Sequence, residues 1–126
     1  MIANNRAVRI GLEVVLWALA ALLASVFARA GLAKFDATSG WSHAFAAWGY
    51  PAAFRMLIGT LEVLAAALVL WPRTAAYGGI IIVTIMLGGM ATHALIERRP
   101  ARATHELGQL VFASLLTGGR WRARKR

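Results

Sequence analysis

The 126-residue sequence contains no cysteine, and it has few acidic residues and few prolines. The missing cysteines exclude disulfide bonds, thiolate metal sites, cysteine-ligated iron–sulfur clusters and thiol–disulfide chemistry on this chain. Glycine-rich nucleotide-binding loops and the signatures of serine nucleophiles are also absent. We therefore do not expect this chain to be a catalyst on its own, and we expect no metal site.

Charged residues of either sign are scarce. They make up 15% of the chain, whereas 60% of the residues are hydrophobic. A soluble domain carries about 25% charged and about 45–50% apolar residues. A soluble domain of this size would also bury only about 60–70% of the surface of its unfolded chain. The composition favours a single membrane domain (residues 1–126) over a soluble globule or a disordered chain.

The charges that are present are mostly positive. Fourteen Lys and Arg against five Asp and Glu give a net charge of +9. These basic residues flank apolar stretches, and five of them fall in a basic tail, residues 120–126. Basic residues in such places set membrane topology and contact acidic lipid headgroups. The expected partner is a lipid bilayer, and no nucleic acid.

Four apolar stretches cover about residues 10–30, 54–71, 75–96 and 105–121. A spanning helix needs about 20 residues, and the fourth stretch reaches that length only when its polar ends are included. The sequence predicts an all-α membrane protein with four transmembrane helices in an antiparallel bundle, because lipid cannot satisfy a bare backbone. The first stretch is expected to remain as an uncleaved signal anchor.

The link between the first two stretches contains a predicted short helix, about residues 39–49. Ser39 is a suitable N-cap, and Gly49 a suitable terminator. Its aromatic rings are typical of the membrane–water interface, so we expect an interfacial helix. Four residues of this link are expected to act as interfacial anchors: Lys34, Trp41, Trp48 and Tyr50.

Loop charges predict the orientation. With four spans, both termini and the turn at Pro72 share one side, which holds eight basic residues against six on the other. Positive residues favour the cytoplasm, so both termini are expected there, by a narrow margin.

Several polar residues fall inside the predicted spans or at their ends. Such residues cost about 2.5–3.5 kcal/mol when charged, and they usually face the protein interior and mark function. All are expected in the outer half of the bilayer, where a bundle would gather them around one polar pocket. The expected pocket residues are Arg29, Glu62, His93, His105, Glu106 and Gln109.

The roles of these residues stay open. Glu62 fits a structural ion pair with Arg29, Arg55 or His93, and it equally fits a carboxylate that accepts a proton or binds a ligand. His93 fits a structural hydrogen bond or a proton-active imidazole. A zinc or haem site that uses His93 and His105 is the less favoured alternative.

Several short segments carry a resemblance through their order and spacing. They are residues 27–35 (Phe-Ala-Arg-Ala-Gly-Leu-Ala-Lys-Phe), 45–51 (Phe-Ala-Ala-Trp-Gly-Tyr-Pro), 59–63 (Gly-Thr-Leu-Glu-Val) and 70–74 (Leu-Trp-Pro-Arg-Thr), followed by His93 after a Met-rich span. Together they resemble the first span, interfacial segment, second span and turn of the DoxX-like family of small bacterial membrane proteins.

The resemblance implies a four-helix bundle in the bacterial inner membrane. Some family members are subunits of thiosulfate:quinone oxidoreductases, and others associate with partners in oxidative-stress defence. It thus implies an accessory or anchor subunit of a membrane oxidoreductase, with a quinone as the candidate cofactor. A redox partner subunit or a second copy of the chain would be the protein partner.

One segment departs from that pattern. Longer members carry a Gly/Pro-rich acidic motif before the last span, whereas residues 97–106 are basic here. This departure puts an enzymatic role in doubt. Two other hypotheses therefore stay open. The chain is a non-redox binding or transport protein for a small apolar or weakly acidic molecule, or it is a structural chain whose buried ion pair sets helix register.

Overall fold

The computed structural model describes residues 2–124, and this range is helical with no strand. This confirms the all-α prediction. The elements are α1 (Ile2–Ala33), α2 (Gly40–Ala47), α3 (Ala52–Leu70), α4 (Ala75–Ala91), the π-helix η1 (Thr92–Ile96), the 3₁₀-helix η2 (Pro100–Ala103) and α5 (Thr104–Arg124).

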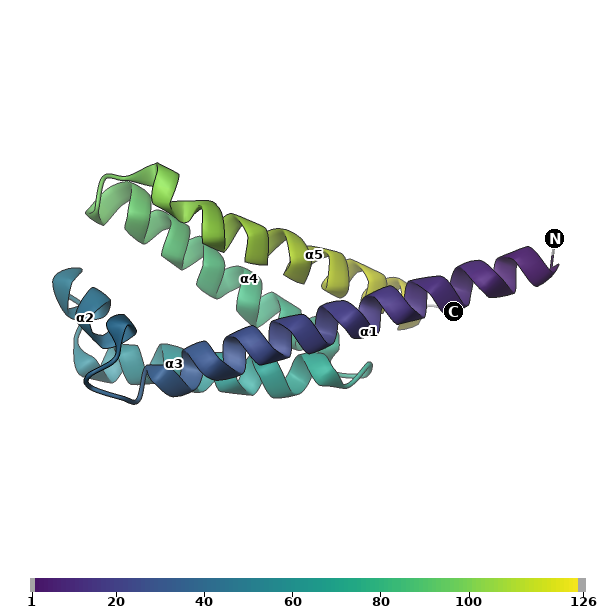
Figure 1. Ribbon diagram of the computed structural model, residues 1–126, viewed down its shortest axis with the longest axis horizontal. Coiled ribbons are helices and arrows are strands. Elements are labelled where there is room, and N and C mark those ends of the chain that lie inside the picture. Colours follow the sequence, from purple (N-terminus) through teal and green to yellow (C-terminus); the bar gives the residue numbers. More distant parts are fainter. Residues whose placement is uncertain (1, 125–126) are drawn as a thin grey trace.

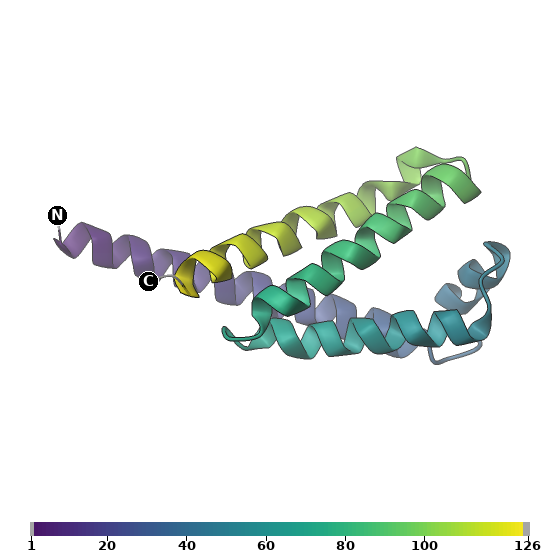
Figure 2. The same cartoon turned by 180° about the vertical axis from the view of Figure 1, so that it is seen from behind.

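The four long helices form two antiparallel pairs. Helix α1 packs along α3, and α4 packs along α5. The pairs meet near the tight α3–α4 turn and diverge toward the end that carries α2 and η2 (Figure 1; Figure 2, from behind). We call this the α2 end. The opposite end carries the first and last described residues, and there α1 extends beyond the other helices.

The core lies where the two pairs meet. Its largest fully buried side chains come from all four long helices: Leu23, Phe27, Val69, Ile82 and Leu116. Large apolar side chains also cover the outward faces, among them Val14, Leu57, Ile80 and Leu115. Such outward faces would be costly in water and are well matched to lipid.

Two glycines allow α1 and α3 to cross closely. A Cβ added at Gly31 would lie 2.7 Å from the carbonyl oxygen of Gly59, and one at Gly59 would lie 2.8 Å from that of Gly31. Small residues at such crossings let helix backbones approach in membranes. This crossing brings the side chains of the following turns, Lys34 and Glu62, together.

The short helix predicted in the first link is present as α2. The Ser39 side chain accepts from the backbone N–H of Ser42 at its start, and Gly49 adopts a positive φ of 85° after its end. Arg55 on α3 holds α2 against α3 and the end of α1. Its guanidinium donates to the Lys34 carbonyl and, at 2.7 Å, to the Ser42 hydroxyl.

Three helical segments are long and apolar enough to cross a membrane: Asn5–Ala33, Ala52–Leu70 and Ala75–Ile96. Helix α1 has 32 residues, about 48 Å at 1.5 Å per residue, and so exceeds the hydrocarbon core of about 30 Å. Helix α5 coincides with the fourth predicted span but is more polar and is not among the three. Crossing by a fourth helix stays a prediction.

The predicted basic tail is not uniformly exposed. Arg120 belongs to α5 and is buried, and its guanidinium donates to Glu13 of α1 at 2.9 Å. It also lies 5.3 Å from the ring centroid of Trp17. Lys125 and Arg126 lie outside the described residues. Arg120 therefore ties α5 to α1 instead of facing lipid headgroups.

Candidate ligand cavity at the α2 end

A cavity of about 320 Å³ lies between the two diverging helix pairs. All five α-helices contribute to its lining. One wall is aromatic and is built around Phe45, whose ring centroid lies 5.4, 5.7 and 6.3 Å from those of Trp48, Tyr50 and Phe54. Trp41 completes the aromatic part of the lining. Offset and tilted rings of this kind form a rigid apolar surface.

A buried ion pair lies on the α1–α3 side of the cavity. Lys34 Nζ is 2.5 Å from Glu62 Oε1, and both side chains are 3% exposed. The same ammonium lies 3.9 Å from the ring centroid of Trp41, within the range of a cation–π interaction. The pair therefore holds the end of α1 to α3, and the Lys34 ammonium is already neutralised by Glu62.

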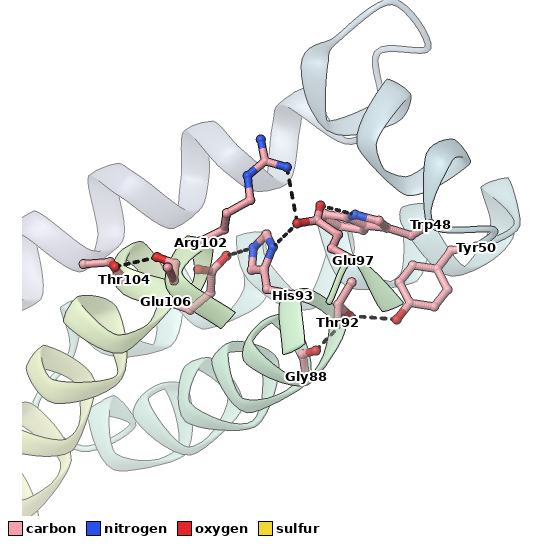
Figure 3. Close-up of polar contacts among 10 residues, drawn as sticks. Trp48, Tyr50, Gly88, Thr92, His93, Glu97, Arg102, Thr104 and Glu106 are labelled. Carbon is pink, nitrogen blue, oxygen red and sulfur yellow. Dashed lines mark hydrogen bonds and ion pairs between the residues drawn. The ribbon is translucent and has the colours of Figure 1, made fainter. Parts of the chain in front are cut away.

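The opposite side carries a network centred on His93 (Figure 3). His93 Nδ1 lies 2.9 Å from Glu97 Oε2, and Nε2 lies 3.0 Å from Glu106 Oε1. Trp48 Nε1 donates to the other Glu97 oxygen at 2.6 Å, and Arg102 Nη1 donates to Glu97 Oε2 at 3.3 Å. The network joins α2, η1, η2 and α5.

Local structure explains why His93 can reach both carboxylates. Residues 92–96 form a π-helix, in which the turn widens, and such insertions are frequent at functional sites. The following Arg98 has a φ of 57°, so the chain reverses there toward η2 and α5. This reversal returns Glu106 to His93.

Glu106 also offers an unused acceptor. Its side chain lines the cavity and is buried, and Oε2 has no hydrogen-bond partner. A buried polar atom without a partner costs about 1–3 kcal/mol. The cavity lining thus contains two carboxylates, Glu62 and Glu106, and one ammonium, Lys34. Its chemistry suits a ligand that donates a hydrogen bond.

Hydrogen bonds perturb the acidity of Glu97, which lies after the third apolar segment. Those from His93, the larger cause, and from Trp48 hold the pKa of the Glu97 carboxyl below its usual range. Glu97 therefore stays ionised at neutral pH and can accept a proton only transiently.

The structure distributes the six expected pocket residues unevenly. Glu62, His105 and Glu106 line the cavity. His93 lies outside the lining and contacts Glu106 there. Arg29 does not line it: it is exposed and donates to Ser25 at 2.5 Å. Gln109 lies outside the lining, and its buried Oε1 has no partner.

Two expectations about basic residues need correction. Glu62 is paired with Lys34, and not with Arg29, Arg55 or His93. Lys34 was expected to be an interfacial anchor, but the close approach at Gly31 and Gly59 leaves it 2% exposed and paired with Glu62. The other expected anchors, Trp41, Trp48 and Tyr50, are half-buried in the cavity lining.

Sequence reasoning missed two further contacts. Trp48 and Glu97 meet across 49 positions, and the hydroxyls of Tyr50 and Thr92 are 2.7 Å apart. No local pattern signals either one. Within residues 2–124, no group of three or more His, Asp and Glu is arranged to hold a metal ion.

An all-helical chain with three long apolar helices, lipid-matched outer faces and a cavity at one end is a small membrane protein. The model of the DoxX-like family matches residues 18–118, and the chain belongs to that family. Searches of curated proteins and of solved structures gave no match.

Proposed function

We propose that this chain is an accessory subunit of a bacterial inner-membrane oxidoreductase, and that its cavity binds the hydroquinone form of a membrane quinone. Helix α5 is the fourth span of the bundle in this proposal, and both termini lie in the cytoplasm. The accessory role rests on family resemblance. The ligand class rests on the cavity.

The size and shape of the cavity support a small flat ligand. Ligand sites usually enclose about 300–1,000 Å³, and the cavity of about 320 Å³ is at the lower end of this range. Its aromatic wall offers ring faces and edges to a planar headgroup. Thr84 and Gly88 line the cavity and are exposed on α4, so an isoprenoid tail can leave there toward lipid.

The polarity of the cavity distinguishes the reduced from the oxidised ligand. The single observation that carries the proposal is the buried, unpartnered Oε2 of Glu106. A hydroquinone O–H can donate to this oxygen. A quinone carbonyl is itself an acceptor and would leave both oxygens without a donor, which is costly when buried.

The same observation weighs against a weakly acidic ligand in the alternative of a non-redox binding or transport protein. An anion would meet two carboxylates, and the ammonium of Lys34 already faces Glu62. A neutral or cationic donor remains compatible with the cavity. Such a ligand is the second candidate, and its binding would be independent of quinone chemistry.

Filling the cavity tests the proposal. Gly88 lines it, and an added Cβ would meet nothing within 4 Å, so Gly88→Leu starts from an unhindered position and adds an apolar side chain at the cavity. Gly108→Leu is the matched control, because its added Cβ is equally free and lies outside the lining. The measurement is anaerobic binding of decylubiquinol to nanodisc-embedded protein, followed by tryptophan fluorescence.

We expect saturable binding of decylubiquinol by the natural protein and by Gly108→Leu. Gly88→Leu should bind it at least about tenfold more weakly. Equal binding by all three proteins would place the ligand elsewhere. Binding of a lipophilic amine without binding of decylubiquinol would favour the non-redox alternative.

A further inference from the structure

The imidazole of His93 connects a carboxylate at the cavity with a carboxylate at the surface. Glu106 lines the cavity and also borders the open depression outside it, where Glu97 follows the third apolar segment and contacts the exposed Arg102. His93 lies between them, 3.0 Å from Glu106 Oε1 and 2.9 Å from Glu97 Oε2 (Figure 3). Both ring nitrogens are thereby engaged by carboxylates.

We propose that Glu106, His93 and Glu97 form a proton relay between the cavity and the aqueous phase at the α2 end. It rests on the cavity of the proposed function, but not on the identity of the ligand. The relay gives a ligand held at Glu106 Oε2 a route for its proton that does not cross lipid.

Proton bookkeeping supports this assignment. The relay has three forms. In the first, Glu106 is protonated and neutral His93 carries its proton on Nδ1. In the second, His93 is an imidazolium between two carboxylates, and in the third, Glu97 is protonated and neutral His93 carries its proton on Nε2. All three forms contain the same number of protons, and each keeps a proton between every nitrogen and its oxygen at the observed distances.

Transfer follows from moving between these forms. A proton leaves Glu106 Oε1 for Nε2, the Nδ1 proton passes to Glu97 Oε2, and Glu97 releases it to water. The ring returns to the starting tautomer by exchange with water in the open depression that His93 lines, losing the proton on Nε2 and gaining one on Nδ1. No bond between heavy atoms forms or breaks, and no oxidant is required.

The neighbours of the relay favour its outward direction. Arg102 from η2 and Trp48 Nε1 from α2 both donate to Glu97, which stabilises its carboxylate and so promotes release of the proton. His105 of α5 and the exposed His43 of α2 line the same outer depression as His93. Neither His105 nor His43 makes a hydrogen bond to His93, Glu97 or Glu106.

A pH-jump experiment tests the relay without any ligand. Nanodisc-embedded protein is mixed rapidly from about pH 8 to about pH 4, and rapid-scan infrared spectroscopy follows the C=O band of protonated Glu106, assigned by its loss in Glu106→Gln. The test variants are His93→Gln and Glu97→Gln. The matched controls are His43→Gln and Glu13→Gln, an exposed histidine and a carboxylate at the opposite end.

We expect protonation of Glu106 to slow at least about tenfold in both test variants, and not in the controls. The effect of Glu97→Gln is decisive, because Glu97 has no hydrogen bond to Glu106 and acts on it only through His93. Unchanged rates in both test variants would overturn the relay. Circular dichroism on each variant separates slow transfer from unfolding, and decylubiquinol binding with unchanged rates would leave the proposed function standing.

Discussion

Removing the charge of Glu62 should destabilise the fold strongly. Lys34 Nζ and Glu62 Oε1 are 2.5 Å apart, and both side chains are 3% exposed. In Glu62→Gln the ammonium keeps the Trp41 ring at 3.9 Å and a long 3.4 Å hydrogen bond to the Ala30 carbonyl, but it loses its anion. Breaking a buried pair on one side costs about 3–5 kcal/mol.

The double variant Lys34→Met/Glu62→Leu should recover most of that loss. Replacing both partners by apolar side chains removes the buried charges together, which is often neutral or stabilising by about 1–4 kcal/mol. The measurement is denaturant unfolding in a mild detergent, followed by circular dichroism, for Glu62→Gln, for the single variants Lys34→Met and Glu62→Leu, and for the double variant.

One result of these unfolding measurements would contradict the burial of the Lys34–Glu62 pair. Loss of less than about 1 kcal/mol in Glu62→Gln would mean that water or lipid headgroups reach Lys34, as at an exposed pair. It would contradict the burial of this pair and the packing at the Gly31–Gly59 crossing. A double variant that is stable but fails to bind decylubiquinol would assign the pair to the ligand site as well.

Three further outcomes follow from the packing. Gly31→Ala should lower the free energy of unfolding by about 1–3 kcal/mol, because its Cβ would lie 2.7 Å from a backbone oxygen. Gly11→Ala, with open space around the new Cβ, should raise the free energy of unfolding by about 0.5–1 kcal/mol. Equal effects in a melting experiment would refute the close crossing. Glu97 has a lowered pKa, so its contribution to stability is present above the pKa of the unfolded chain and is lost as pH falls through its folded pKa. The melting temperature should therefore drop below about pH 4.3, and less so in Glu97→Gln; parallel pH profiles would argue against the hydrogen bonds of Glu97. Arg120→Met should lower the free energy of unfolding by about 0.2–1 kcal/mol, because it removes the 2.9 Å contact with the half-exposed Glu13, and an unchanged unfolding midpoint would show that this contact contributes nothing.

The sequence predicted the helices because their signals are local. Apolar runs, the tight turn at residues 71–74, and Ser39 and Gly49 as caps fixed α2, α3 and α4 to within a few residues. Helix α1 extends further in both directions than its predicted span. The polar residues near its start continue a helix outside the apolar stretch, so hydrophobicity alone could not locate that end.

The partner of Glu62 shows where sequence reasoning failed. Arg29 was the candidate partner on α1, but helical side chains lean toward the helix N-terminus, which directs Lys34 and Glu62 of these antiparallel helices toward each other. The glycines three residues before each of them, Gly31 and Gly59, were the available signal. Reading them requires knowledge of which helices cross.

The network around His93 depended on structure that no pattern encodes. The sequence singled out His93 and Glu106 separately, yet their contact arises from the π-helical turn and the reversal at Arg98. Glu97, at the end of this turn, falls between the third and fourth predicted spans. Convergence from η1, η2, α2 and α5 is a tertiary property, and only the fold supplies it.

The central claim is that the cavity prefers a ligand that donates a hydrogen bond. Comparing the binding of a reduced and an oxidised ligand tests this claim most directly. The measurement is the dissociation constant of decylubiquinol and of oxidised decylubiquinone for the natural protein and for Glu106→Gln. We predict tighter binding of the reduced form by the natural protein, and a preference that shrinks in Glu106→Gln, whose amide also donates a hydrogen bond. Tighter binding of the oxidised form, or a preference that does not change in Glu106→Gln, would contradict the account.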